Sequence, residues 1–468
     1  MMDKAKVSRR AGFLAGGLAA AMLAAPGFGQ DNDVEQLRAE LELLQLRLEG
    51  VEQQQAEAPE NGAAVFDTSA FKPGWERVRY DGWMEHGRLE EMSVLIGRGG
   101  PIDLYMGVQT AGRLQYLQQS DVVTAAGQSL PGALEPGFQT AWGSIDFLAD
   151  LYDGALEVYF DLYLSSPTSA DKLQGHEGYM IVRSIPGTEG TLLGQLMDVI
   201  DVKAGQFEID FGDYRYRRTD NARSQRNPLV GNHVMDPKTT EIGMEAFNAY
   251  ESPVNWLVGF GSGDETGGFD PGRGISVHGK LWANLGDLRL AGSTYHVHHA
   301  DDNASSNHFR TSRGGGVYQG IFTGNAPGQV FVGTGTSVLA FQGDVTWISG
   351  DVELYGNVGW VRDRSSAGGR EEWYYYGVEG VYYIQPRLHA AARYSGAAAQ
   401  RLAGSSSSGH VHRVQVGGGY WIFSTVLAKV EYVYQAYDGF SAGETVGGIQ
   451  AWQDPSFNGV IAEISFGF

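Results

Sequence analysis

The chain has 468 residues, a formal charge of −21, 67 glycines, 23 tyrosines, 21 phenylalanines, 10 tryptophans and no cysteine. The absence of cysteine excludes a disulfide scaffold and a cysteine-based zinc module, and the acidic balance argues against nucleic acid as a partner. After the N-terminus no run of about 20 apolar residues occurs, so soluble β proteins and transmembrane β-barrels remain, because barrels hide their apolar face in a period of two.

Residues 1–29 have the features of an export signal peptide. A charged start precedes the uncharged, apolar stretch 11–25, and the small residues Gly27 and Gly29 suit cleavage before Gln30. The pair Arg9-Arg10 hints at twin-arginine export, so the sequence leaves both the Sec and the twin-arginine route open.

Residues 30–58 contain the clearest helical pattern of the chain. Its apolar residues follow the a/d spacing of a heptad repeat: Val34, Leu37, Leu41, Leu44, Leu48 and Val51. The pairs Asp33 with Arg38 and Arg47 with Glu52 would attract one another between parallel chains. This pattern predicts a short trimeric coiled coil, and an amphipathic helix packed on its own protein is the alternative. We expect residues 59–101 to form a linker before the barrel, with no assignment for residues 66–100.

From residue 102 onward, apolar residues recur at every second position, as in Leu156, Val158, Phe160 and Leu162. This period predicts sixteen strands. Their expected ranges are 102–117, 138–149, 155–165, 177–184, 202–210, 239–249, 254–261, 274–284, 288–297, 337–348, 351–361, 372–383, 386–395, 410–421, 425–436 and 458–468.

The connections between these strands alternate between long and short. The long ones are 118–137, 166–176, 211–238, 262–273, 298–336, 362–371, 396–409 and 437–457, and residues 185–201 are the exception among the short ones. Bacterial outer-membrane barrels have long extracellular loops and short periplasmic turns. The fold class expected is therefore all-β, a 16-stranded antiparallel transmembrane barrel over residues 102–468, with the coiled coil in the periplasm.

Two stretches resemble outer-membrane barrel families. The alternating aromatic strand that ends on Phe468 resembles the C-terminal signal read during barrel assembly. The stretch VKAGQF at 202–207, followed by Phe211-Gly212, is similar to the G-Q-F-x-x-P-F-G motif of the phosphate-selective porin O/P family, although Asp210 stands where the family has proline. The resemblance implies a trimeric 16-stranded porin whose third long loop folds into the barrel.

The third long loop carries a concentration of positive charge within an acidic chain. Five arginines fall within twelve residues: Arg215, Arg217, Arg218, Arg223 and Arg226. Guanidinium groups bind phosphate and carboxylate in bidentate fashion. With the resemblance, they are expected to form an anion-binding constriction; a solvated extracellular loop paired with lipid phosphates or carboxylates is the alternative.

Charged residues of both signs occupy strand positions opposite the apolar set and are expected to line the lumen. The cationic set is Lys280, Arg289, Arg387, His389, Arg393, Arg413 and Lys429. The acidic set is Asp146, Glu157, Asp161, Glu208, Asp210, Asp344, Glu353, Glu431 and Glu463. A transverse field between basic and acidic walls is thus as compatible with the sequence as uniform anion selectivity.

Other candidate sites have simpler explanations. A metal site is conceivable at one cluster of histidines and aspartates: His296, His298, His299, Asp301 and Asp302. A position at the barrel rim explains these residues better, so no metal or other cofactor is expected. The aromatic residues Trp347, Trp360, Trp373, Tyr374, Tyr376 and Tyr382 fit interfacial girdles better than a sugar-binding ladder. No nucleophile elbow or catalytic Ser–His spacing stands out, so we expect no enzyme; an outer-membrane phospholipase or protease is the least supported alternative.

The function expected from these patterns is a homotrimeric outer-membrane porin. It would let small anionic or polar solutes diffuse through a water-filled channel, with a bias to anions, phosphate among them, set by the loop arginines. The alternative is a structural anchor in which the coiled coil tethers the barrel to the cell wall. The expected partners of the protein are outer-membrane lipid and other copies of the chain.

Overall fold

The computed structural model describes residues 94–120, 122–123, 129–130, 136–164, 173–219, 224–235, 240–248, 253–263, 274–298, 318–321, 337–364, 369–402, 408–440, 445–446, 449–450 and 455–468. The chain divides into two compact units, Met1–Ala64 and Val65–Phe468, and every described residue belongs to the second. The expected signal peptide, coiled coil and most of the linker lie outside the described residues, as do Arg223, His299, Asp301 and Asp302.

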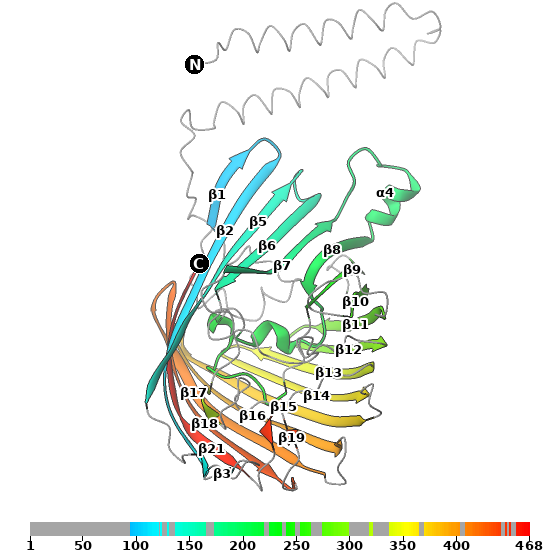
Figure 1. The fold of residues 1–468 in the computed structure, drawn as a ribbon. Coiled ribbons are helices and arrows are strands. Elements are labelled where there is room, and N and C mark those ends of the chain that lie inside the picture. Colours follow the sequence, from blue (N-terminus) through cyan, green and yellow to red (C-terminus); the bar gives the residue numbers. More distant parts are fainter. Residues whose placement is uncertain are drawn as a thin grey trace, which may run out of the picture. The chain divides into compact units, whose positions relative to one another are not determined.

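Sixteen antiparallel strands form a closed barrel, because β2 pairs with β5, the next strand of the barrel, on one side and with the last strand, β21, on the other (Figure 1). The predicted 16-stranded barrel is therefore confirmed. The strands are β2 (Ile102–Gln119), β5 (Gly137–Leu151), β6 (Leu156–Leu164), β7 (Leu173–Val182), β8 (Ile200–Glu208), β9 (Thr240–Asn248), β10 (Val254–Gly261), β11 (Ser276–Leu285), β12 (Leu288–His298), β13 (Ser337–Ser349), β14 (Val352–Arg364), β15 (Arg370–Gln385), β16 (Leu388–Arg401), β17 (His410–Phe423), β18 (Val426–Asp438) and β21 (Ser456–Gly467).

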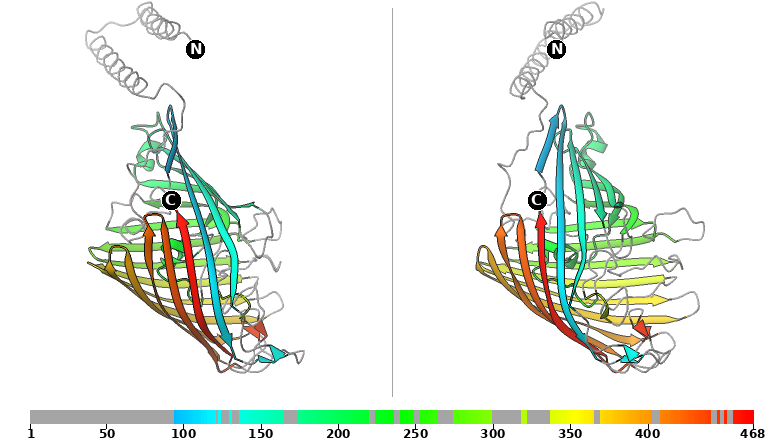
Figure 2. Two further views of the ribbon diagram at one scale, coloured as in Figure 1. Left: turned by 90° about the vertical axis from the view of Figure 1, so that its left-hand side faces the viewer. Right: turned by 60° about the vertical axis from the view of Figure 1, so that its left-hand side comes forward.

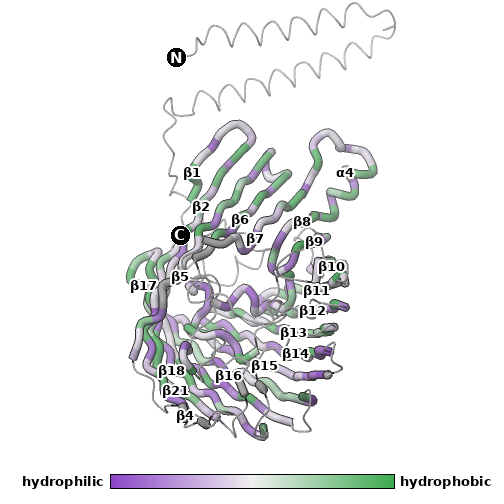
Figure 3. Tube along the Cα trace, in the orientation of Figure 1, coloured by the Kyte–Doolittle hydropathy of each residue, from purple (hydrophilic) through white to green (hydrophobic). Residues whose placement is uncertain are grey.

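The two faces of the wall differ in polarity because side chains alternate along each strand. Apolar side chains such as Leu281 and Val358 point away from the lumen and are 62% and 61% exposed. The intervening positions, such as Lys280 and Asn357, face the lumen and are buried. Figure 3 shows the same alternation as purple and green residues along the strands.

The two rims differ in the length of their connections. Tight turns join strands at one rim, for example β13 to β14 through Gly350, whose φ of 59° suits glycine. This rim also carries α4 (Leu192–Met197), a six-residue helix between β7 and β8. At the other rim, two of the long connections contain small hairpins that the sequence did not predict, β3 (Val122–Val123) with β4 (Ser129–Leu130) and β19 (Thr445–Val446) with β20 (Ile449–Gln450). None of the helices in the described part of the chain is long and apolar enough to cross a bilayer.

An additional strand, β1 (Val94–Gly99), lies in the segment 66–100, for which no structure was predicted. It pairs with the part of β2 between Ile102 and Met106, whereas β21 pairs with β2 from Gln109 onward. Figures 1 and 2 show that β21 ends, at the point marked C, well short of the turn between β1 and β2. β1 thus covers an edge of β2 that β21 leaves unpaired, which protects that edge from adding another strand.

Candidate functional site

The connection between β8 and β9, the third loop, folds into the lumen. Its described residues are almost all buried, and they include two short 3-10 helices, Tyr214–Arg217 and Ser224–Arg226. Backbone N–H groups bind hydroxyls of distant strands: Gly212 N donates to Ser293 Oγ on β12, and Val234 N donates to Ser395 Oγ on β16. The loop therefore reaches across the lumen and is anchored at both ends.

The first half of the loop is held through acidic side chains. Asp213 forms ion pairs with Lys280 (2.9 Å) and Arg289 (2.8 Å), and Lys280 also binds Asp210 at 2.8 Å. Burial opposes ionisation of Asp213, but the charges of Lys280 and Arg289 outweigh it and lower the pKa of this carboxyl group. Two of the wall cations expected to face the lumen thus bind carboxylates of the loop.

The loop arginines differ in their surroundings. Arg217 pairs with Glu353 (2.9 Å) and Glu379 (3.2 Å), and Arg218 pairs with Glu208 (2.7 Å). Both arginines are nearly inaccessible, at 3% and 2% exposure. Arg215 and Arg226 are only half-buried.

Arg215 donates a hydrogen bond to the Glu208 carbonyl at 2.6 Å, and its guanidinium group lies over the Tyr216 ring. The nearby carboxylates of Asp210, Glu208 and Glu177 also stabilise its positive charge.

The second half of the loop is held by the basic wall of β16 to β18. Lys429 donates to the carbonyls of Ser224, Asn227 and Leu229 at 2.6–3.0 Å. Arg413 donates to the Asn232 carbonyl at 2.7 Å.

Arg393 and two wall acceptors complete this attachment. Arg393 donates to the Gly231 carbonyl and to Asn227 Oδ1, and it pairs with Glu379. The Glu431 carboxylate accepts the N–H groups of Val230 and Gly231. These wall residues therefore hold the loop in place through hydrogen bonds, most of them to its backbone.

His233 lies at the centre of this arrangement. Its ring is 3.9 Å from the Tyr214 ring, centroid to centroid, and it occupies the space beside Gly377, where an added Cβ would lie 2.4 Å from His233 Cε1. Burial, together with the positive charges of Arg393, Arg413 and Arg217, lowers the pKa of His233 well below its usual value. The imidazole is therefore neutral at pH 7.

A second segment, Tyr318–Ile321 of the long connection between β12 and β13, also lies in the lumen. Tyr318 donates a 2.6 Å hydrogen bond to Glu431 and accepts one from Gln415. The third loop passes so close to Tyr318 that a Cβ at Gly231 would collide with its hydroxyl. The sequence analysis missed this segment, whose only signal is a tyrosine and an isoleucine within a glycine-rich loop.

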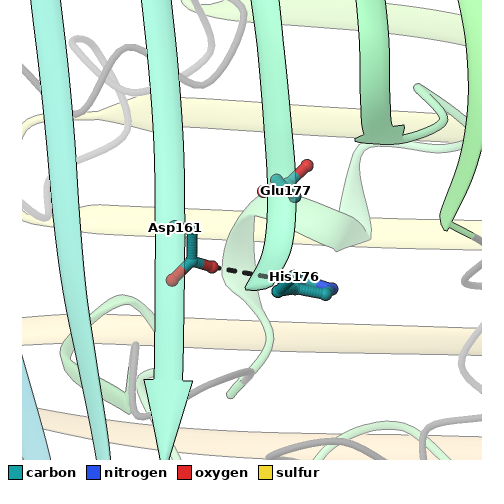
Figure 4. A group of neighbouring side chains, drawn as sticks. All are labelled: Asp161, His176 and Glu177. Carbon is teal, nitrogen blue, oxygen red and sulfur yellow. Dashed lines mark hydrogen bonds and ion pairs between the residues drawn. The ribbon is translucent and has the colours of Figure 1, made fainter. Parts of the chain in front are cut away.

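A group of three residues facing the lumen from β6 and β7 has the composition of a metal site: Asp161, His176 and Glu177 (Figure 4). His176 Nδ1 lies 3.2 Å from Asp161 Oδ2, His176 Nε2 lies 3.3 Å from Thr240 Oγ1, and Glu177 accepts the N–H of Glu208 at 2.7 Å. Both imidazole nitrogens and a Glu177 oxygen are thus engaged with protein groups. We assign the group a structural role in joining β6, β7 and β9.

The sequence analysis missed His176 and Glu177 because a bulge changes the alternation of β7. Asp161 pairs with Glu177, but Leu162 pairs with Gly175, so His176 is the extra residue. Both consecutive side chains consequently face the lumen.

Most residues expected on the lumen wall do face it. Buried inward side chains include all nine acidic residues, and Lys280, Arg289, His389, Arg393, Arg413 and Lys429. Arg387 is a correction: β16 begins at Leu388, so Arg387 lies exposed in the turn after β15.

Two further expectations concern residues near the lipid-facing surface. Trp373 is a correction, because it is 1% exposed and faces the lumen, whereas its neighbour Tyr374 is 47% exposed. Adjacent residues of one strand cannot share a girdle. His296 and His298 lie exposed on the outward face of β12.

Comparisons with known proteins concern the fold. No protein-family model matches the chain, and no curated protein matches its sequence. The chain is similar to the anion-selective porin from Comamonas acidovorans, with a TM-score of 0.49, 12% identity, and coverage of 78% of this chain and 100% of that one. The outer-membrane channel DcaP of Acinetobacter baumannii has a TM-score of 0.47 and 12% identity, with coverage of 78% of this chain and 97% of that one. OmpT of Vibrio cholerae has a TM-score of 0.47 and 12% identity, with coverage of 80% of this chain and 99% of that one. Scores of this size carry no argument about function.

Proposed function

We propose that the protein is a porin of the bacterial outer membrane. A closed antiparallel barrel satisfies all backbone hydrogen bonds between its strands, which is the condition for spanning a bilayer without helices. Its outward wall carries exposed apolar side chains such as Val258, Leu281 and Val358, which suit contact with lipid. Transport would be passive diffusion without covalent chemistry.

The observation that carries this proposal is the third loop inside a closed barrel. The loop bonds to β11 and β12 through Asp213 and to β16, β17 and β18 through its carbonyl groups. A segment fixed on opposite parts of the wall narrows the lumen to a defined width. Pore width and the charges at this point then select the solute.

An anion bias is best supported by two of the five loop arginines. The charges of Arg217 and Arg218 are balanced by three carboxylates, so their role is to hold the loop. Arg215 and Arg226 also have interactions with the protein, but they are part-exposed, so they are the loop arginines that passing anions, phosphate among them, would meet. The acidic residues on β5 to β7 limit this bias to a preference rather than an exclusion of cations.

The proposed assembly is a homotrimer. This part of the proposal rests on the heptad seam from Val34 to Val51, which would place a coiled coil before the barrel. Contact of that coiled coil with the cell wall would be an additional role of a working pore.

A structural anchor is the second candidate, and one observation favours it. Two segments, the third loop and Tyr318–Ile321, occupy the same lumen and meet at Gly231. If the two segments together blocked the lumen, the barrel would conduct no solute and would act only as a membrane anchor.

Conductance in planar lipid bilayers separates the two functions. The porin proposal predicts stepwise current increments for the folded protein and none for the same preparation after heat unfolding. A folded protein that adds no current at any applied voltage would contradict the porin and support the anchor.

A further inference from the structure

The outward face of β14 and β15 changes character toward the long-loop rim. Because the two strands pair in register, side chains that share this face form successive cross-strand pairs. The pairs are, in order toward the rim, Val358 with Tyr376, Trp360 with Tyr374, Arg362 with Glu372, and Arg364 with Arg370. The face thus passes from apolar to aromatic to charged within a few residues.

The charged part of this face is dominated by arginine. Arg362 lies over the Trp360 ring at 5.6 Å, Arg370 donates to Glu372 at 2.5 Å, and Arg401 of β16 is opposite Glu372. Arg364 and Arg370 are directly opposite one another, so the positive charges of the cluster lie close together. Four arginines against Glu372 give a local charge of +3 on a chain of −21.

An apolar groove of about 720 Å³ adjoins the arginines on the same outer face. Trp360 and Tyr374, the pair next to Arg362 and Glu372, line one end of it. It extends across the strands to Trp256 on β10. The groove exists because Gly279, Gly292 and Gly343 have no side chain on this surface.

We propose that the arginines and the groove form one binding site for a phosphate-bearing lipid of the outer leaflet. The phosphate would lie against Arg362, Arg364 and Arg370, and an acyl chain would lie in the groove. Arg362 lies about 7 Å beyond Trp360 along the strand, which places it at headgroup level above the aromatic belt. Guanidinium groups bind phosphate oxygens in bidentate geometry, which suits a phosphomonoester.

The proposal rests on the proposed outer-membrane location and is independent of conduction. A barrel that passes no ions would still bind the lipid, so failure of one proposal is distinguishable from failure of the other. A second copy of the chain is the competing occupant of the groove, and free inorganic phosphate is the competing ligand of the arginines.

The test is lipid binding to the full-length protein, measured by native mass spectrometry from detergent. The probes are a diphosphorylated lipid A, the same lipid without phosphate, and inorganic phosphate. The site predicts that the wild type binds the phosphorylated lipid about tenfold more tightly than the dephosphorylated one. The triple variant R362Q/R364Q/R370Q should lose that preference.

A second variant tests the groove. A Cβ at Gly292 would meet nothing within 4 Å, so Gly292→Leu can extend its side chain into the groove and should weaken binding of both lipids. The matched controls are Arg387→Gln, in a turn at the other rim, and Gly112→Leu, whose added Cβ also meets nothing within 4 Å. Both controls should bind lipid as the wild type does.

Three results would overturn the proposal. The first is equal affinity of the wild type for the phosphorylated and dephosphorylated lipid. The second is displacement of the lipid by millimolar inorganic phosphate, which would identify a site for the free ion. The third is a Gly292→Leu protein that keeps full lipid binding but loses its oligomeric state, which would make the groove an interface between copies.

Discussion

Arg217 of the third loop and Glu353 of β14 form a 2.9 Å ion pair inside the barrel, although 136 residues separate them in the sequence. Arg217 also pairs with Glu379 on β15, which in turn binds Arg393 on β16. The network ties the loop to three successive strands. Arg217, which the sequence predicted to bind anions at the constriction, thus helps to fix the position of the third loop.

Replacing Glu379 by Gln should destabilise the barrel by about 3 kcal/mol, because buried Arg393 loses its carboxylate partner and buried Arg217 keeps only Glu353. The measurement is the free energy of unfolding by guanidinium in lipid vesicles. Glu372→Gln on the same strand is the matched control, since its pair with Arg370 lies on the outer surface and should contribute about 0–1 kcal/mol. Equal effects of the two changes would contradict this account of the network.

Gly377→Ala should displace His233 and loosen the third loop. The added Cβ would lie within 2.5 Å of two atoms of the His233 ring, and this ring also packs against the Tyr214 ring, at 3.9 Å between centroids. We expect higher single-channel conductance and lower stability, by about 1–3 kcal/mol. Gly380→Ala is the control, because its Cβ would meet only Leu354 Cδ2, at 3.4 Å. A Gly377→Ala protein with wild-type conductance and stability would contradict this packing.

Acidification should destabilise the loop through His233. Its pKa is lowered in the folded protein, so below about pH 6.5 the unfolded chain binds more protons, and stability falls as the pH falls. The unfolding free energy of the wild type should therefore decrease more between pH 8 and pH 5 than that of His233→Gln. His298→Gln, which removes an exposed histidine, should keep the wild-type slope. An unchanged slope in His233→Gln would refute the assignment.

Tyr318→Phe should release the second inward segment. The substitution removes the hydrogen bond to Glu431 and leaves a buried carboxylate oxygen with one donor fewer, at a cost of about 1–3 kcal/mol. Conductance should rise because this segment shares the lumen with the third loop. Tyr382→Phe, on the outward face, is the control and should change neither property. A Tyr318→Phe protein indistinguishable from the wild type in both would show that Tyr318 does not hold this segment.

The strands could be predicted from the sequence because a wall between lipid and water imposes a period of two on every strand. The predicted directions of side chains were wrong or incomplete where a strand departs from this period. The bulge at His176 turns two consecutive residues inward, and Trp373 shares its aromatic character, but not its direction, with Tyr374. β1 was missed because it covers only the projecting end of β2.

The partners in the lumen were beyond the reach of the sequence. Inward positions for Glu353 and Glu431 follow from alternation, but their contacts with Arg217 and Val230 depend on the path of a loop that folds back across the barrel. That path is set by many long-range bonds to carbonyl groups, which leave no mark in residue type. For the same reason, the sequence could not separate the part-exposed Arg215 and Arg226 from the buried Arg217 and Arg218.

The most direct test of the central claim is the reversal potential across a planar bilayer under a potassium chloride gradient. The account predicts a chloride-preferring potential for the wild type, unchanged in Arg387→Gln, and a shift toward cation preference in the double variant R215Q/R226Q. A wild-type potential that favours potassium, or one that the double variant leaves unchanged, would contradict an anion bias set by the third loop.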